Sequence, residues 1–183
     1  MNRNLKDLNP IVEAKTIEWL EACKNAGLDI LVTNTYRDMH EQTKLYNQGR
    51  TAPGNIVTYA KAGYSYHQHR LAVDFCPMLG GECAWNRTDL FTQAGEIAKE
   101  IGFEWAGDWK YKDMPHIQMT FGLSLQDLLH GAKPPREVTH WADKPHAYLL
   151  ENYLDSLEKR YDDKITRGEI FSLLARILKG LED

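Results

Sequence analysis

The sequence predicts a domain of mixed helices and short strands, followed by a smaller helical module. Its 183 residues suffice for one ordinary domain with a small appendage. Between residues 9 and 131, segments with helix-capping residues alternate with short runs of apolar and β-branched residues. The adjacent prolines of "AKPPRE", Pro134 and Pro135, then indicate a stiff linker, because a helix interior does not accommodate proline. We therefore expect two domains, residues 1–132 and residues 133–183.

The first three elements are predicted from capping signals and residue type. A helix over residues 9–27 has Asn9 as its N-cap, Pro10 at its first helical position and a glycine at its end. A strand rich in β-branched residues follows at 29–37. A second helix, at 38–49, begins with an aspartate cap and ends at a glycine.

The later elements follow a long loop. Residues 50–69 contain too many Gly, Pro and Ser residues for a long regular element. After this loop we expect a buried strand at 71–76, a helix at 87–102, strands at 103–105 and 115–120, and a short helix at 124–131. Beyond the linker, two further helices are predicted at 145–160 and 167–180.

The composition argues against several classes of function. The chain has 22 basic and 26 acidic residues, and this balance gives no sign of nucleic-acid binding. No apolar run approaches the roughly 18 residues that a membrane span requires. The polar N-terminus shows no secretory signal, so we expect synthesis in a host cytoplasm and reduced cysteines. Cys76 lies two residues after Asp74, but we interpret it as a small buried apolar residue rather than a metal ligand.

Both strands in the second half of the domain have an apolar face and a polar face. Side chains alternate along a strand, so Asp74 points away from the apolar residues of 71–76. In 115–120, His116 and Gln118 likewise share the face opposite to their apolar neighbours. This pattern is typical of a sheet that forms the floor of a site.

Potential metal ligands gather beside these strands. A catalytic zinc site uses three protein ligands and leaves a fourth position for water. His67, Asp74 and His116 offer two imidazoles and one carboxylate, which leave the ion positively charged and able to lower the pKa of that water. Asp113, three residues before His116, is the predicted general base, and Arg37 is the predicted cation for a developing oxyanion.

Each of these residues could instead have a purely structural role. A single histidine is more often a polar residue satisfied by its neighbours than a metal ligand. Arg37 could be a surface arginine that pairs with Asp38 or Glu41. The clustering of ligands and base in two short segments favours the metal site.

The motifs around these residues resemble those of a known family. "SYHQHRLAVD", residues 65–74, resembles the S-x-H-x-x-G-x-A-x-D motif of zinc peptidases related to D-alanyl-D-alanine carboxypeptidases of the VanY type. "WAGDWKYKDMPHIQ" resembles their second motif, in which a tryptophan-rich run precedes D-x-x-H. The upstream segment "TNTYRDMHEQTKLYNQGRTAPGNIVT" is similar to the L-alanyl-D-glutamate endopeptidases, which include phage endolysins and bacterial autolysins. The likeness covers about residues 10–125.

This resemblance implies an α+β fold of the Hedgehog/DD-peptidase type, with a small, mainly antiparallel sheet flanked by helices. It implies Zn²⁺ as the cofactor and the stem peptide of bacterial peptidoglycan as the substrate. The residues it assigns are metal ligands His67, Asp74 and His116, catalytic residues Asp113 and Arg37, and substrate-binding residues Ser65 and Arg37, to which we add Gln118.

The chain departs from the family pattern at two positions. Arg70 stands where the motif has glycine, and glycine there would permit a left-handed turn. We expect the loop to absorb this change, with the arginine side chain in water. Ala106 replaces the first glycine of a "WGGDW" run, which is a smaller change.

The sequence leads to one favoured function and two alternatives. We expect a zinc-dependent endopeptidase that hydrolyses the L-alanyl-D-glutamate bond of peptidoglycan and acts on the wall as a phage endolysin after release. The alternatives are a D-alanyl-D-alanine carboxypeptidase and a non-catalytic wall-binding module. The two C-terminal helices resemble part of an S-layer homology repeat, which would bind a secondary wall polymer, or they form a helical cap.

Overall fold

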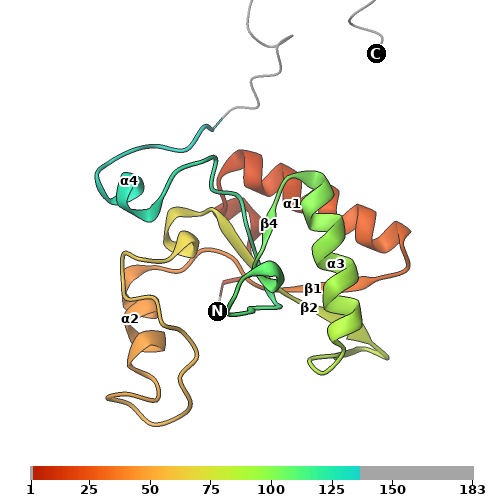
Figure 1. The fold of residues 1–183 in the computed structure, drawn as a ribbon, viewed down its shortest axis with the longest axis horizontal. Coiled ribbons are helices and arrows are strands. Elements are labelled where there is room, and N and C mark those ends of the chain that lie inside the picture. Colours follow the sequence, from red (N-terminus) through yellow and green to blue (C-terminus); the bar gives the residue numbers. More distant parts are fainter. Residues whose placement is uncertain (1, 137–183) are drawn as a thin grey trace, which may run out of the picture. The chain divides into compact units, whose positions relative to one another are not determined.

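The structure is a computed structural model that describes residues 2–136 (Figure 1). The predicted C-terminal helices, and the wall-polymer binding expected of them, lie outside these residues. Among residues 2–136, no helix combines the length and apolar character that a membrane span needs.

The helices and strands lie close to their predicted positions. The α-helices are α1 (Pro10–Asn25), α2 (Met39–Asn47), α3 (Thr88–Ile101) and α4 (Leu125–Leu129). The strands are β1 (Asp29–Asn34), β2 (Ala72–Leu79), β3 (Glu82–Cys83), β4 (Glu104–Trp105) and β5 (His116–Gln118). Short 3₁₀ turns occupy Leu5–Asp7, Tyr66–His69 and Ala106–Asp108. The structure adds β3 and these turns to the prediction.

Capping residues set the helix boundaries. The side chain of Asn9 accepts a hydrogen bond from the backbone N–H of Ile11, and Pro10 opens α1. The Asp38 side chain caps α2 in the same way, and Ser124 forms a capping box at α4. These predicted caps are therefore confirmed.

The strands form one antiparallel sheet in the order β1-β2-β5-β4, with β3 paired to β2. The predicted fold class, α+β with a small antiparallel sheet flanked by helices, is confirmed. β2 is the central strand, since it pairs with β1 on one side and with β5 on the other. Side chains on β2 therefore reach the middle of both sheet faces.

Helices α1 and α3 lie against one face of this sheet (Figure 1). Trp19 of α1 donates a hydrogen bond from Nε1 to the carbonyl oxygen of Ala94 in α3, at 2.9 Å. The Phe75 ring of β2 packs 5.0 Å from Trp19 and 5.4 Å from Phe91 of α3, measured between ring centroids. This apolar layer is the core, and it leaves the opposite face of β2 to the polar side chains.

Arg70 has the left-handed backbone conformation that the family motif assigns to glycine. Its φ is 66° and its ψ is 27°, at the end of the turn Tyr66–His69. The residue is exposed, but its guanidinium lies 4.2 Å from the centre of the Tyr36 ring. It also donates a hydrogen bond to the carbonyl oxygen of Asp7 at 2.5 Å. The loop thus absorbs the arginine, and the side chain is held against the protein surface.

Candidate metal centre

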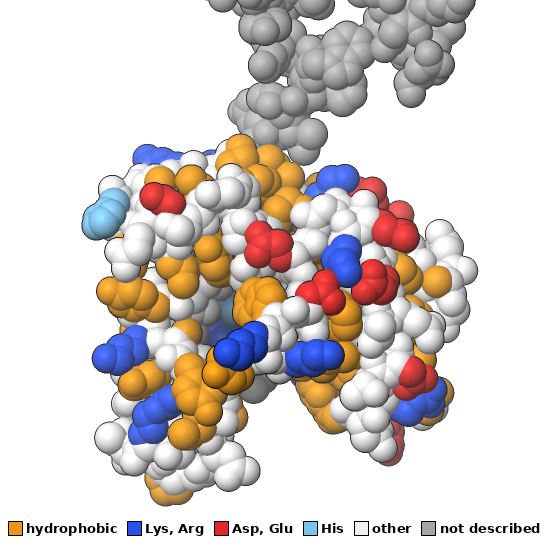
Figure 2. Space-filling model, in the orientation of Figure 1, with side chains coloured by type: hydrophobic (Ala, Val, Ile, Leu, Met, Phe, Trp, Pro, Cys, Tyr) orange, Lys and Arg blue, Asp and Glu red, His pale blue; other side chains and the backbone are white. Residues whose placement is uncertain are grey.

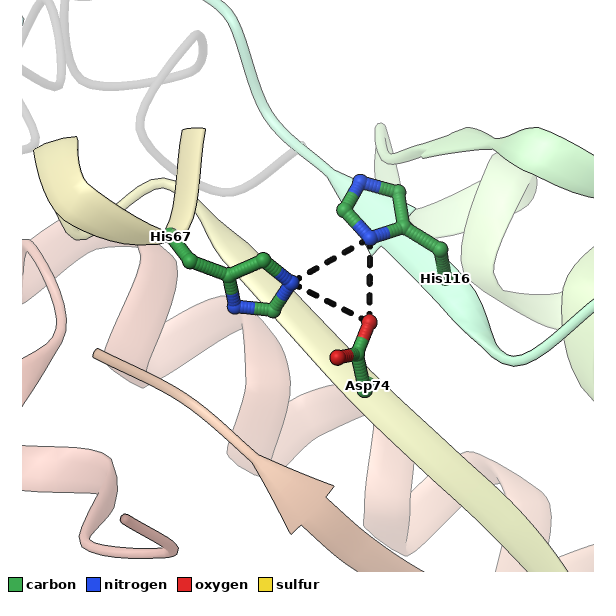
Figure 3. A group of neighbouring side chains, drawn as sticks. All are labelled: His67, Asp74 and His116. Carbon is green, nitrogen blue, oxygen red and sulfur yellow. Dashed lines mark hydrogen bonds and ion pairs between the residues drawn. The ribbon is translucent and has the colours of Figure 1, made fainter. Parts of the chain in front are cut away.

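The three predicted metal ligands converge on one point (Figure 3). Asp74 in β2 and His116 in β5 are directly opposite each other in the antiparallel register. His67 approaches from the turn Tyr66–His69, and its side chain is only 2% exposed. Two neighbouring strands and one turn therefore bring together residues that are 49 positions apart in the sequence.

The distances between the three ligand atoms fit a metal ion. Asp74 Oδ1 lies 3.1 Å from His67 Nε2 and 3.0 Å from His116 Nδ1, and the two nitrogens are 3.3 Å apart. A tetrahedral zinc ion with bonds of roughly 2.0–2.1 Å requires its ligand atoms to lie about 3.3 Å apart. The three atoms thus form a triangle close in size to one face of that tetrahedron.

Hydrogen bonds on the outer side of each imidazole set its tautomer. His67 Nδ1 lies 2.6 Å from the carbonyl oxygen of Thr35, which can only accept a hydrogen bond. His116 Nε2 lies 3.1 Å from Oε1 of Gln118, also an acceptor. Each outer nitrogen therefore carries a proton, which leaves the inner nitrogen of each ring, when the ring is neutral, to bind a cation at the shared site.

A second layer of hydrogen bonds orients Gln118. Its Nε2 donates to Glu104 Oε2 at 2.9 Å, and Thr120 Oγ1 donates to the other oxygen of Glu104 at 2.6 Å. Glu104 and Gln118 are partners across β4 and β5, so the register of these strands creates the contact. Both ends of the Gln118 amide are engaged by the protein. Its predicted role in substrate binding stays untested, and these contacts favour a role in holding His116.

The charges around the site favour the metal-binding protonation state of two of the three candidate ligands. Burial lowers the pKa of His67. Burial alone would raise the pKa of Asp74, but the two neighbouring histidines hold it well below its usual value. Burial opposes the charge on His116, yet the hydrogen bond to Asp74 raises its pKa above the usual value. The site therefore favours an ionised Asp74 and a neutral His67, whereas a cation would have to displace the proton that His116 shares with Asp74.

Arg37 lies beside the ligand triangle. Its Nη2 pairs with Oδ2 of Asp74, which is the oxygen that does not face the histidines. Its side chain is 13% exposed, so it is not the surface arginine of the alternative interpretation. Arg37 Nε is buried and has no hydrogen-bond partner within residues 2–136. An unpaired buried donor beside a site is costly unless a ligand oxygen accepts from it.

Asp113 is placed by the short segment that precedes β5. Its backbone N–H donates to the carbonyl oxygen of Ala106, and its own carbonyl oxygen accepts from the N–H of His116, each at 3.1 Å. Trp105 Nε1 also donates to the carbonyl oxygen of Met114 at 2.9 Å. Partial burial raises the pKa of the Asp113 carboxyl. A raised pKa suits a group that must take up a proton during a reaction.

The site opens into a cavity of about 680 Å³. Ser65, Arg37 and Asp113 all line it, together with the three candidate ligands. The face shown in Figure 2 is hollowed near its centre, and histidine atoms lie inside the hollow. All the predicted site residues thus lie in or around one cavity, and their individual roles stay predictions.

Two contributors to the site were not predicted. The Thr35 carbonyl and the Glu104 carboxylate act on the ligands through hydrogen bonds. A backbone carbonyl has no signature in a sequence. Glu104 could have been found only by pairing "FEW" with "HIQ" in the correct register.

Three potential metal ligands that line a cavity are compatible with a metallopeptidase, and comparisons with known proteins support this class. Residues 58–119 match the family model described as D-alanyl-D-alanine carboxypeptidase. The peptidoglycan L-alanyl-D-glutamate endopeptidase CwlK of Bacillus subtilis is 45% identical over 123 residues, which cover 62% of this chain and 74% of CwlK. Because the chain is 45% identical to CwlK over 74% of its length, it belongs to the same family of peptidases.

Further relatives extend the likeness. An L-alanyl-D-glutamate peptidase of a Listeria phage is 28% identical over 163 residues, which cover 84% of this chain and about half (52%) of the relative. The crystal structure of the Serratia marcescens L-Ala D-Glu endopeptidase ChiX matches with a TM-score of 0.50 and 26% identity, covering 64% of this chain and 84% of that one. DacB of Streptococcus pneumoniae matches with a TM-score of 0.50 and 23% identity, covering 72% and 80%, and supports the fold alone.

Proposed function

We propose that this chain is a zinc-dependent peptidoglycan endopeptidase that cleaves between L-alanine and D-glutamate of the stem peptide. The observation that carries the proposal is the triangle formed by His67, Asp74 and His116, with sides of 3.0 to 3.3 Å. The triangle fits zinc, and the L-alanyl-D-glutamate bond is supported by the 45% identity to CwlK.

The residues around the triangle have complementary tasks in hydrolysis. A zinc ion held there would supply positive charge that lowers the pKa of water and polarises the peptide carbonyl. Asp113 takes the proton from the attacking water and returns it to the amine of D-glutamate as the C–N bond breaks. Arg37 donates a hydrogen bond from its unpaired Nε to the carbonyl oxygen as negative charge develops on it. Ser65 lines the cavity, where it is placed to contact the substrate.

Digestion of purified peptidoglycan tests the bond that is cut. Mass spectrometry of the products should show new peptides that begin with D-glutamate, and muropeptides that end at L-alanine. Treatment with a chelator should abolish the release of these products, and added zinc should restore it. Full lysis after thorough chelation would contradict the metal mechanism.

The second candidate is D-alanyl-D-alanine carboxypeptidase activity, because the matching family model carries that description. The same digest separates the two functions. Release of free D-alanine, with L-alanyl-D-glutamate linkages intact, would favour the carboxypeptidase.

The setting of the enzyme is part of the proposal. We infer that it acts on the bacterial cell wall, as the names of its relatives indicate. A phage origin and a wall-binding role for residues 133–183 stay predictions.

A further inference from the structure

Arg3 stands out among the residues that line the cavity. The other arginine of the lining, Arg37, has its charge paired with Asp74. Within residues 2–136, no carboxylate lies within ion-pair distance of Arg3. Its side chain is therefore the only lining guanidinium in the described part of the chain whose charge remains available to a ligand.

The backbone around Arg3 is fixed relative to the metal centre. The carbonyl oxygen of Asn2 accepts from the N–H of Thr35 at 2.8 Å, and that of Asn4 accepts from the Thr35 hydroxyl at 3.1 Å. Thr35 in turn accepts the hydrogen bond from Nδ1 of His67. Arg3 thus lies between two residues bonded to the same threonine, which itself positions a candidate metal ligand.

The proposed substrate carries a charge that matches this arginine. In the stem peptide, D-glutamate continues the chain through its γ-carboxyl group, so its α-carboxylate is free and lies next to the bond that is cut. The guanidinium group forms a planar pair of hydrogen bonds with a carboxylate. Arg3 is exposed and lines the cavity, so its guanidinium is open to a ligand bound there.

We propose that Arg3 binds the free α-carboxylate of the D-glutamate on the leaving side of the scissile bond and thereby sets a preference for acidic stem peptides. This inference rests on the proposed endopeptidase function and names a specificity residue for it. It predicts discrimination against peptides in which the same position is D-isoglutamine, because an amide in place of the carboxylate removes the negative charge.

The test uses two synthetic stem peptides, one with D-glutamate and one with D-isoglutamine, and the full-length zinc-loaded enzyme. The unmodified enzyme should cleave the acidic peptide with a kcat/KM about 3–10 times higher, as expected for a charge-assisted pair that is partly exposed to solvent. Arg3→Gln should remove this preference by raising KM for the acidic peptide and leaving the amidated peptide unchanged. Arg3→Lys should keep part of the preference, since the charge remains and the planar geometry is lost.

Lys6→Gln is the matched control, because it removes one positive charge from a residue outside the cavity lining. It should leave the ratio between the two peptides unchanged. Equal effects of Arg3→Gln on both peptides, or no effect on either, would overturn the assignment of Arg3. If the unmodified enzyme leaves the L-alanyl-D-glutamate bond of both peptides intact, the proposed function itself is wrong.

Discussion

Because the backbone at Arg70 is left-handed, we expect the variant with glycine at position 70 to be more stable than the variant with alanine. Arg70→Ala keeps a side-chain carbon in the left-handed conformation and loses the contacts of the guanidinium with Tyr36 and Asp7. The cation–π contact is worth about 0.5–1 kcal/mol at an exposed site. The hydrogen bond adds about 0.5–1 kcal/mol. We expect Arg70→Ala to lower the free energy of unfolding by about 1–2 kcal/mol.

Arg70→Gly loses the same contacts but also relieves the backbone. The left-handed conformation costs a residue with a Cβ roughly 1–2 kcal/mol. Glycine gives back about 0.4–1 kcal/mol, because it makes the unfolded chain more flexible. The glycine variant should therefore be about 1 kcal/mol more stable than the alanine variant, and within about 1 kcal/mol of the original protein.

Denaturant unfolding at equilibrium measures this difference, provided that the free energy of unfolding depends on denaturant concentration with the same slope in both variants. Lys24, exposed near the end of α1, provides the control pair. In a helix the order reverses, and Lys24→Gly should be about 1 kcal/mol less stable than Lys24→Ala. If Arg70→Ala unfolds at a higher denaturant concentration than Arg70→Gly while the Lys24 pair behaves as expected, the left-handed assignment is refuted.

Three further predictions follow from the contacts around the site and the core. Gln118→Leu removes the acceptor of the His116 Nε2–H and should weaken zinc binding about 10–100-fold. Competition with a chromophoric chelator measures this affinity, and an unchanged value would rule out a role of Gln118 in orienting His116. Gly95→Ala would place a Cβ 2.2 Å from the Trp105 ring. This overpacking should lower the free energy of unfolding by about 1–3 kcal/mol, which a lower unfolding temperature of the variant would show. In the folded protein at pH 8, a thiol reagent should label only the half-buried Cys83. Burial raises the pKa of Cys23 and Cys76 to about 12 and keeps both thiols protonated. Labelling of three thiols without denaturant would contradict this prediction.

The helix boundaries could be predicted because their causes are local. Asn9, Asp38 and Ser124 cap the helices that immediately follow them, and each cap involves contacts only two or three residues away. The alternating faces of the two strands could be predicted for the same reason. The polar face therefore indicated the candidate ligands before any pairing of strands was known.

The rest of the site depends on long-range contacts that local patterns do not encode. Asp74 and His116 meet because β2 and β5 pair in one particular register. The link from His116 through Gln118 to Glu104 requires the register of β4 as well. Arg37 had no predicted partner in β2, because 37 residues separate it from Asp74. Such pairings depend on which strands are neighbours in the sheet.

The packing of the core and the geometry of the metal centre are coupled through β2. Phe75 is held on the apolar face between Trp19 and Phe91, and Asp74 therefore points to the opposite face toward His116. A slip of β2 by one residue would turn the carboxylate into the core and bring the phenyl ring toward the cavity. Both consequences are unfavourable, since a buried unpaired charge and an exposed aromatic ring each cost free energy. The apolar contacts of Phe75 thus fix the register that places the metal ligand, so the precision of the site originates in the core beneath it.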